Sequence, residues 1–143
     1  MRRIETTVDI AASPERVWSV MSEVLLMPSW TDSITSVELD PPGPLAVGSR
    51  ARIVQPKLSA ASWVVTELTP VRSYSWVSRA MGADVTASHT ITPTSDGASV
   101  TLAVEYDGRL STVVYGLTRK ITTKYLRTEA EGLKKASEST SKR

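Results

Sequence analysis

Residues 110–136 read LSTVVYGLTRKITTKYLRTEAEGLKKA, the one long helical pattern in the chain. Apolar side chains recur three or four residues apart along this stretch, at Leu110, Val114, Leu117, Ile121 and Tyr125. At ~1.5 Å per residue the helix would be about 40 Å long. Seven strand patterns precede it, and a seven-stranded sheet is roughly 33 Å wide, whereas a helix is about 10–12 Å across. The sheet must therefore curl around the helix, and the space between them becomes core or a ligand cavity.

The strand patterns are short alternations of apolar and polar residues separated by turn residues. In the first, Ile4, Thr6, Val8 and Ile10 alternate with charged or polar neighbours, which predicts one buried face. Short connections, such as the turn at residues 94–97, favour antiparallel neighbours. The predicted strands cover residues 3–10, 37–39, 50–55, 63–68, 74–78, 85–91 and 100–106.

Two short helices are expected between the first and second strands. Ser13 suits an N-cap and Pro14 suits the first helical position. Val17, Trp18, Met21 and Val24 then fall on one face, and a second helical turn is expected over residues 25–30. The predicted fold is therefore α+β, a seven-stranded curved antiparallel sheet wrapped around a long C-terminal helix.

Length and composition indicate a single globular domain. The chain has 143 residues, 41% hydrophobic and 22% charged, with no cysteine and no apolar run near the ~20 residues of a membrane span. We expect one domain over residues 1–137 and a polar, disordered tail over residues 138–143. No apolar stretch follows the basic N-terminus, so a secretory signal is not expected and the expected location is the cytoplasm. The sequence leaves open whether the chain forms a homodimer.

The positive charge is concentrated near the C-terminus. Residues 118–143 carry eight basic and three acidic side chains, a net charge of +5, against +2 for the whole chain. Such a segment could contact anionic partners, which would make the chain an interaction module. A solvated helix face is favoured, because no aromatic–basic interleaving or nucleic-acid motif accompanies the charge. We therefore expect no nucleic-acid partner.

Several short motifs, together with the order of elements, resemble the START-like/Bet v 1-like (SRPBCC) superfamily. The branch that they are most similar to is the bacterial polyketide cyclase/dehydrase group. The motifs are residues 12–18 (ASPERVW), 28–30 (PSW), 43–49 (GPLAVGS), 63–68 (WVVTEL), 96–97 (DG) and 129–134 (EAEGLK). The resemblance implies a helix-grip fold over nearly the whole chain, and the superfamily includes cyclases as well as lipid and hormone carriers. Fold similarity alone does not supply a mechanism.

His89 is the one histidine and the candidate catalytic residue. Val85, Ala87, His89 and Ile91 share a face of their strand, so the imidazole is expected to point into the cavity. There it could act as a general acid or base near neutral pH, or be a half-buried side chain paired with a polar neighbour. With one histidine and no cysteine a metal site is not expected, and no phosphate loop or redox motif indicates a cofactor.

Aromatic and apolar residues on the inward faces are the candidate ligand-binding residues. Flat apolar ligands suit aromatic walls, and an indole N–H adds a polar handle. Gln55 follows Ala51 and Ile53 on one face, so its amide is expected to point inward and to need a partner. The candidates are Trp30, Gln55, Trp63, Tyr74, Trp76, Tyr106, Leu117 and Ile121. Trp18 is expected to be core, and the tryptophans of the candidate set could equally supply core bulk.

Other polar residues have two interpretations. Glu67 shares a face with Trp63 and Val65, but Val64 and Leu68 argue that the opposite face is buried, which would place Glu67 in water. An inward Glu67 would instead be a candidate acid or base with a raised pKa. Arg79 and Met81 are expected in the loop after the fifth strand, as an ordinary connector or as the border of the cavity mouth.

The sequence thus predicts binding of a small hydrophobic molecule, aromatic or polycyclic, between sheet and helix. The resemblance to polyketide cyclases implies aldol-type ring closure or dehydration, with His89 moving the proton and Gln55 polarising a carbonyl. The alternative is a carrier or sensor of hydrophobic molecules, in which the polar groups only orient the ligand.

Overall fold

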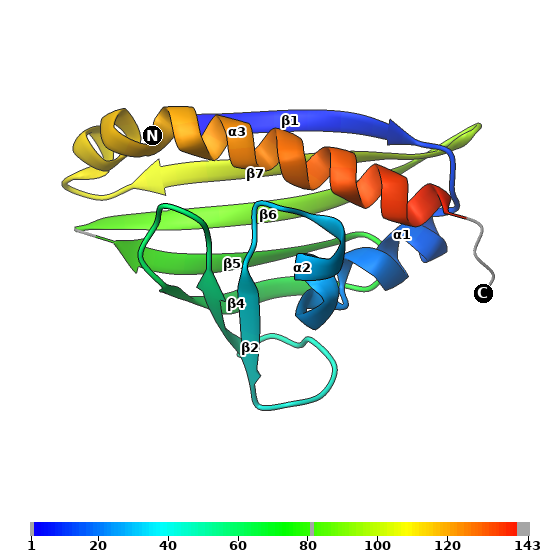
Figure 1. Cartoon of the computed structure of the whole chain (residues 1–143), viewed down its shortest axis with the longest axis horizontal. Helices are drawn as coiled ribbons and strands as arrows, with labels where there is room; N and C mark the ends of the chain where they lie inside the picture. The colour runs from blue at the N-terminus through cyan, green and yellow to red at the C-terminus, as the bar shows by residue number, and fades with distance from the viewer. Residues whose placement is uncertain (1, 81, 140–143) are drawn as a thin grey trace.

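An antiparallel sheet curves around a long C-terminal helix in the computed structural model, which describes residues 2–80 and 82–139 (Figure 1). Seven strands of the described chain form this sheet in the order β1-β7-β6-β5-β4-β3-β2. The helix-grip fold predicted from the sequence is confirmed. The elements are β1 (Arg2–Ile10), α1 (Pro14–Met21), η1 (Val24–Leu26), α2 (Met27–Trp30), β2 (Ser36–Asp40), β3 (Arg50–Val54), β4 (Ala61–Thr69), β5 (Ser73–Ala80), β6 (Ala83–Thr94), β7 (Gly97–Asp107) and α3 (Ser111–Glu138).

Local signals explain where the first helix begins. The Ser13 side chain accepts a hydrogen bond from the Arg16 N–H at 3.1 Å, and Pro14 occupies the first turn. The second predicted turn forms as η1 followed by α2, with Pro28 in the first turn of α2. These short elements lie at the same end of the sheet as the C-terminal end of α3 (Figure 1).

The β6–β7 hairpin requires glycine at its turn. Gly97 has φ +152°, and a Cβ there would lie 2.3 Å from the Ile10 carbonyl oxygen at the end of β1. A side chain would therefore collide with the β1 backbone, where Ile10 pairs with Ala98. This close approach lets β1, first in the chain, join the sheet beside β7, the last strand.

The inward face of α3 differs from the predicted one. Leu117 is 71% exposed and Leu110 and Val113 are also exposed, whereas Val114, Leu126, Ala130 and Leu133 are buried. Thr118 and Thr122 lie on the inward side of the N-terminal half and contact β7 through hydroxyl groups. The prediction that Leu117 faces the interior is wrong, because hydrogen bonding lets threonines replace the larger apolar side chains there.

The C-terminal end of α3 is joined to the first connection. The Glu138 carboxylate accepts hydrogen bonds from the Ala11 N–H at 2.8 Å and from Lys134 at 2.6 Å. The backbone N–H, the larger effect, and the lysine lower the pKa of Glu138. Glu138 is thus helical rather than part of a tail. Ser139 of the predicted tail follows the helix and is exposed, and residues 140–143 lie outside the described residues, as does Met81.

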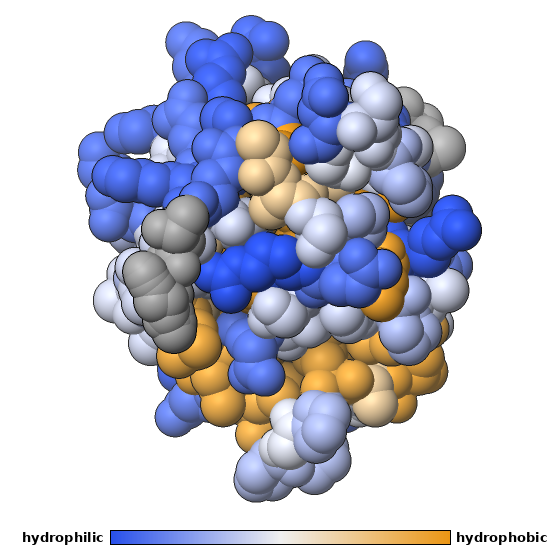
Figure 2. All heavy atoms as spheres, turned by 90° about the vertical axis from the view of Figure 1, so that its right-hand side faces the viewer, coloured by the Kyte–Doolittle hydropathy of each residue, from blue (hydrophilic) through white to orange (hydrophobic). Residues whose placement is uncertain are grey.

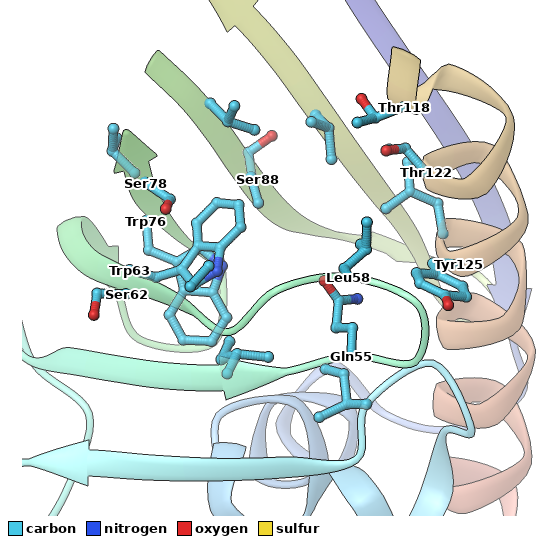
Figure 3. A pocket seen from close by; sticks show the side chains of 18 of the residues that line it. Gln55, Leu58, Ser62, Trp63, Trp76, Ser78, Ser88, Thr118, Thr122 and Tyr125 are labelled. Atoms are coloured by element: carbon cyan, nitrogen blue, oxygen red, sulfur yellow. The ribbon is translucent and has the colours of Figure 1, made fainter. Parts of the chain in front are cut away.

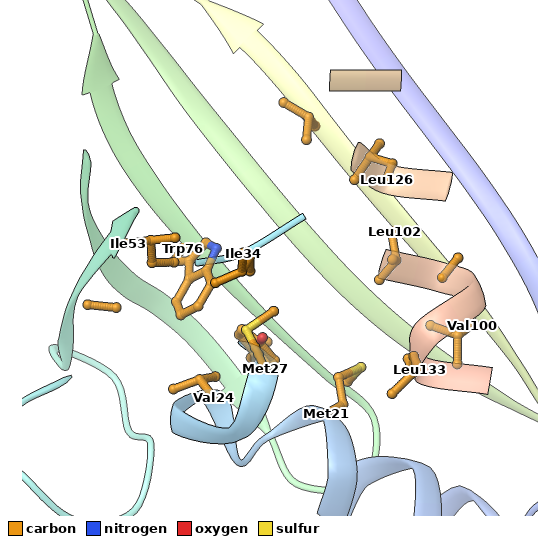
Figure 4. Close-up of a cluster of buried hydrophobic side chains, with 14 of the residues drawn as sticks. Met21, Val24, Met27, Ile34, Ile53, Trp76, Val100, Leu102, Leu126 and Leu133 are labelled. Carbon is orange, nitrogen blue, oxygen red and sulfur yellow. The ribbon is translucent and has the colours of Figure 1, made fainter. Parts of the chain in front are cut away.

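Side chains fill the interior where α1, η1 and α2 face the C-terminal half of α3. Met21, Val24 and Met27 come from the short helices and lie opposite Leu133 and Val100 (Figure 4). These five side chains are no more than 2% exposed. At the outside of this end, hydrophobic residues gather on one part of the surface (Figure 2). Exposed leucines in η1 are Leu25 and Leu26.

Candidate functional site

A cavity of about 900 Å³ lies under residues 114–129 of α3. It is bounded by α3, the inner faces of β3 to β7 and the β3–β4 connection at residues 55–60. Figure 3 shows Thr118, Thr122 and Tyr125 projecting from α3 on the side opposite Trp63 and Trp76. A volume of this size falls at the upper end of what small-molecule sites usually offer.

Two indoles form one wall of the cavity. Trp63 lies on β4 and Trp76 on β5, with ring centroids 6.1 Å apart and planes tilted by 41°. The antiparallel pairing Val65 with Trp76 and the two-residue alternation of β4 place both rings on the inner face. A β-bulge between Val65 and Glu67 then shifts the register, so Glu67 is exposed, as the favoured interpretation of the sequence predicted.

Five of the nine predicted site residues line this cavity. They are Gln55, Trp63, Trp76, His89 and Tyr106. The Gln55 side-chain amide donates to the Ser33 carbonyl at 3.2 Å, which gives the half-buried amide one of its partners.

The other four predicted residues do not line the cavity. Trp30 lies against Gly132 at the filled end, where its carbonyl oxygen would be 2.0 Å from an added Cβ. Tyr74 is fully buried beneath the His89 ring. Leu117 is exposed to solvent, and Ile121, its neighbour on the same predicted stripe, is half-buried outside the lining. Leu117 and Ile121 are misplaced because α3 turns a different face inward from the predicted one, and Tyr74 because it lies deeper than the cavity wall.

His89 is held in one orientation by its surroundings. It lies on β6 between Tyr74 of β5 and Leu102 of β7, and it is 4% exposed. The ring stacks on Tyr74 with centroids 4.1 Å apart, and it meets Trp76 edge to face at 5.7 Å. Nδ1 is 3.2 Å from the Tyr74 carbonyl oxygen, and since a carbonyl only accepts, Nδ1 carries the hydrogen. In the neutral ring Nε2 therefore has the free lone pair.

Glu129 is a further candidate site residue, which the sequence patterns did not indicate. Its Oε2 lies 3.6 Å from His89 Nε2, and the two side chains are only 13% and 5% exposed. A carboxylate at this distance stabilises an imidazolium that forms when Nε2 takes a proton. The available signal was helical spacing, because Glu129 lies three residues after Leu126 and four before Leu133, two buried positions of α3.

Tyr74 completes this buried group. Burial, the larger effect, and the charge of Glu129 raise the pKa of Tyr74 well above its usual value. The phenol therefore stays neutral across the physiological range. Among the described residues its hydroxyl has no hydrogen-bond partner. Tyr74 thus supports the His89 ring by stacking and contributes its backbone carbonyl.

A second polar group lies further toward the N-terminus of α3. The Tyr106 hydroxyl of β7 is 2.9 Å from both Thr118 Oγ1 and Thr122 Oγ1. Thr118 also donates to the Val114 carbonyl within the helix at 2.8 Å. All three hydroxyl-bearing residues line the cavity, so its polar atoms form two groups along α3, one at Thr118 and Thr122 and one at Glu129.

The β3–β4 connection closes one side of the cavity. The Tyr125 hydroxyl of α3 donates to the Pro56 carbonyl, and Leu58 of the same connection projects over the cavity (Figure 3). Arg79 lies in β5 rather than in the following loop, and it forms an exposed ion pair with Asp84 at 3.0 Å on the rim.

Residues 2–80 and 82–139 contain no group of three or more His, Cys, Asp or Glu side chains arranged to hold a metal ion. No helix in these ranges is long and apolar enough to cross a membrane.

Solved structures with the same fold share little sequence with this chain. Protein MLL2253 from Mesorhizobium loti has 18% identity and a TM-score of 0.76, over 99% of this chain and 100% of that one. Norcoclaurine synthase from Thalictrum flavum, in complex with dopamine and hydroxybenzaldehyde, has 14% identity and a TM-score of 0.76, over 99% and 89%. The di-domain ARO/CYC StfQ from the steffimycin biosynthetic pathway has 12% identity and a TM-score of 0.76, over 95% and 50%. These likenesses establish the fold.

The sequence matches a protein family but no individual curated protein. No curated protein matches the chain. Residues 1–138 match the family described as polyketide cyclase / dehydrase and lipid transport. The resemblance inferred from the motifs is confirmed, and the chain belongs to this polyketide cyclase/dehydrase and lipid transport family.

Proposed function

We propose that the chain encloses a small aromatic or polycyclic molecule in the cavity under α3 and acts on it by proton transfer through His89. The observation that carries this proposal is the buried His89–Glu129 pair on the lining of a cavity of about 900 Å³. Trp63 and Trp76 offer a flat apolar wall to a ring system. One structural neighbour holds dopamine and hydroxybenzaldehyde, both small aromatic molecules, which supports the same ligand class.

The proposed reaction is an aldol-type ring closure followed by dehydration. His89 Nε2 removes a proton from a carbon next to a ketone, and the enolate carbon forms a C–C bond to a second carbonyl of the same molecule. The imidazolium returns the proton to the new alkoxide, which gives a hydroxyl. In the dehydration, Nε2 takes a second α-proton and the imidazolium protonates the departing hydroxyl, so one water leaves and a C=C bond remains.

Each residue of the site has a separate part in this proposal. Glu129 stabilises the imidazolium in both steps, and the Tyr74 carbonyl holds the neutral ring in the tautomer whose Nε2 carries the lone pair. The second N–H of the Gln55 amide and the indole N–H groups are available to polarise a carbonyl. Holding a flexible chain in a reactive conformation supplies much of the acceleration.

The test compares two isosteric variants with a matched control. Turnover of a linear poly-β-ketone thioester is measured by chromatography for the wild type, His89→Gln, Glu129→Gln and the exposed control Glu67→Gln. Loss of a positioned acid–base group should lower kcat about 10²–10⁴-fold in His89→Gln, with a smaller loss in Glu129→Gln and none in the control. Undiminished turnover by His89→Gln would refute the proposed chemistry.

A non-catalytic carrier is the second candidate, favoured by the words lipid transport in the family description. The His89–Glu129 pair is complete without a ligand, so it could serve only to fix the β6–α3 packing. Native mass spectrometry of the purified protein separates the two functions. A retained lipid that His89→Gln still holds would favour the carrier, and a bound cyclised product or its precursor would favour the enzyme.

A further inference from the structure

The direction of each hydrogen bond among the Tyr106, Thr118 and Thr122 hydroxyls can be assigned. Thr118 has one hydroxyl hydrogen, and it is donated to the Val114 carbonyl. Thr118 Oγ1 must therefore accept from Tyr106, 2.9 Å away. This uses the single hydrogen of Tyr106, so the phenol oxygen accepts from Thr122, also 2.9 Å away. The chain of donation runs from Thr122 through Tyr106 and Thr118 to the Val114 carbonyl.

This direction leaves acceptors, and no donor, facing the cavity from the three hydroxyls. Thr122 is the first donor in this series of hydrogen bonds, and it belongs to the cavity lining. The lone pairs of its Oγ1 are therefore open to a donor on a ligand. A ligand carbonyl or ether oxygen at this point would face another oxygen lone pair, whereas a ligand hydroxyl or amine would complete the chain.

The C-terminal end of the α3 lining, at Glu129, has the same polarity. Nδ1 of His89 donates to the Tyr74 carbonyl, so in the neutral ring Nε2 presents a lone pair there, as does the Glu129 carboxylate. Glu129 follows Thr122 by seven residues, or two turns, which corresponds to about 10 Å along α3. Two acceptor sites thus lie on one helix face, and the indoles of Trp63 and Trp76 lie across the cavity from that helix (Figure 3).

We infer that the cavity selects a flat ligand that carries two hydrogen-bond donors, hydroxyls or amines, one for Thr122 and one for the His89–Glu129 pair, in preference to a ligand with carbonyls or ethers at these two positions. This inference rests on the proposed function and specifies its ligand class as the hydroxyl-bearing aromatic product rather than the poly-β-ketone chain that precedes it. The donor beside Thr122 is for recognition, and the donor beside His89 lies near the base Nε2. Carbonyls of the same ligand belong opposite indole and amide N–H groups, which can donate.

The test uses 2,6-dihydroxynaphthalene and 2,6-dimethoxynaphthalene as probes of the full chain. The two share a ring system and differ in their donors, and affinity is measured by isothermal titration calorimetry. The wild type should bind the diol roughly tenfold more tightly than the ether, as expected when one or two hydrogen bonds to buried acceptors are lost.

Two threonine variants separate donor recognition from shape. Thr122→Val keeps the side-chain volume and removes the acceptor, so diol affinity should fall about fivefold to tenfold while ether affinity stays constant. The control Thr123→Val removes a half-buried hydroxyl that lies outside the cavity lining and donates to the Arg119 carbonyl, and it should change neither affinity. In Thr118→Val, Tyr106 loses its acceptor and can donate to Thr122, which frees a donor toward the cavity. The preference for the diol should then shrink.

The outcomes distinguish this inference from the function on which it rests. Equal binding of both probes by the wild type, or an unchanged preference in folded Thr122→Val, overturns the inference and leaves ligand binding intact. Binding of neither probe by the wild type contradicts the proposed aromatic ligand and the inference with it. Circular dichroism establishes that each variant is folded. If Thr122→Val does not fold, Tyr106→Phe replaces it, because it removes the middle hydroxyl of the hydrogen-bond series.

Discussion

The two halves of the interior share one helix and one sheet but are filled differently. Under the C-terminal half of α3, Leu133 packs against Met21 and Val100 with almost no exposure. Nearer its N-terminus, over residues 114–129, the same helix faces a cavity of about 900 Å³. The difference arises because α1, η1 and α2 add a layer of side chains at one end, whereas the β3–β4 connection is the main cover of the other, where Met27 of α2 and Ile34 are also part of the lining. The cavity thus begins where these short elements end.

The largest expected effect comes from the same substitution made in each half. Leu133→Ala removes a fully buried side chain from the filled half, and it should lower the free energy of unfolding by about 2–5 kcal/mol. Leu58→Ala acts on a half-buried side chain at the cavity, where its loss leaves no closed void, and it should cost under about 1 kcal/mol. Urea denaturation measures both. Equal losses would mean that the cavity is as tightly packed as the core.

Two glycines of α3 allow a second matched comparison. A Cβ at Gly132 would lie 2.0 Å from the Trp30 carbonyl oxygen, whereas none of the described atoms lies within 4 Å of a Cβ at Gly116. Gly132→Ala should therefore destabilise by about 1–3 kcal/mol, because α2 must move away. Gly116→Ala should stabilise by roughly 0.5–1 kcal/mol through helix propensity. Thermal unfolding of the two variants gives the sign, and a stabilising Gly132→Ala would contradict the described α2–α3 contact.

Alkaline pH should destabilise the chain through Tyr74, which lies where the two halves meet. Its pKa is raised in the folded state by burial and by Glu129. The unfolded chain therefore ionises first, so the stability from the neutral phenol is complete below about pH 10 and is lost as the pH rises above it. In Tyr74→Phe this loss should be absent. Urea unfolding of both proteins from pH 8 to 11 measures the difference, and parallel pH profiles would count against a buried phenol.

The smallest expected effect concerns Glu138, which joins the end of α3 to the β1–α1 connection. Its pKa is lowered by the Ala11 N–H and by Lys134, so its contribution is present above the unfolded pKa and lost as the pH falls through the folded one. Lys134→Met should raise the titration midpoint of Glu138 in carboxyl NMR spectra. The remaining Ala11 contact should still hold the midpoint below that of an unfolded-state glutamate. An unchanged midpoint in the variant would exclude the lysine contribution.

Much of the site was predictable from periodicity, and the rest depended on contacts between distant residues. The alternation around His89 correctly predicted a buried, inward imidazole, and Gln55 and Tyr106 were placed on the cavity side in the same way. The His89–Glu129 pair joins residues forty positions apart on different elements, so no local pattern contains it. The bulge at β4 that exposes Glu67 depends on how β4 pairs with β5, which is also a property of the assembled sheet.

The sequence by itself determined the seven strands, the capped first helix and the long last helix, because strand alternation, the Ser13-Pro14 start and helical spacing act over a few residues. It also determined that one helix cannot cover the sheet, since this follows from element dimensions. Only the tertiary structure decided which face of α3 turns inward and which half of the interior stays open. Hydrogen bonds with Tyr106 make Thr118 and Thr122 acceptable as inward residues, and these bonds depend on β7, a strand that ends several residues earlier in the chain.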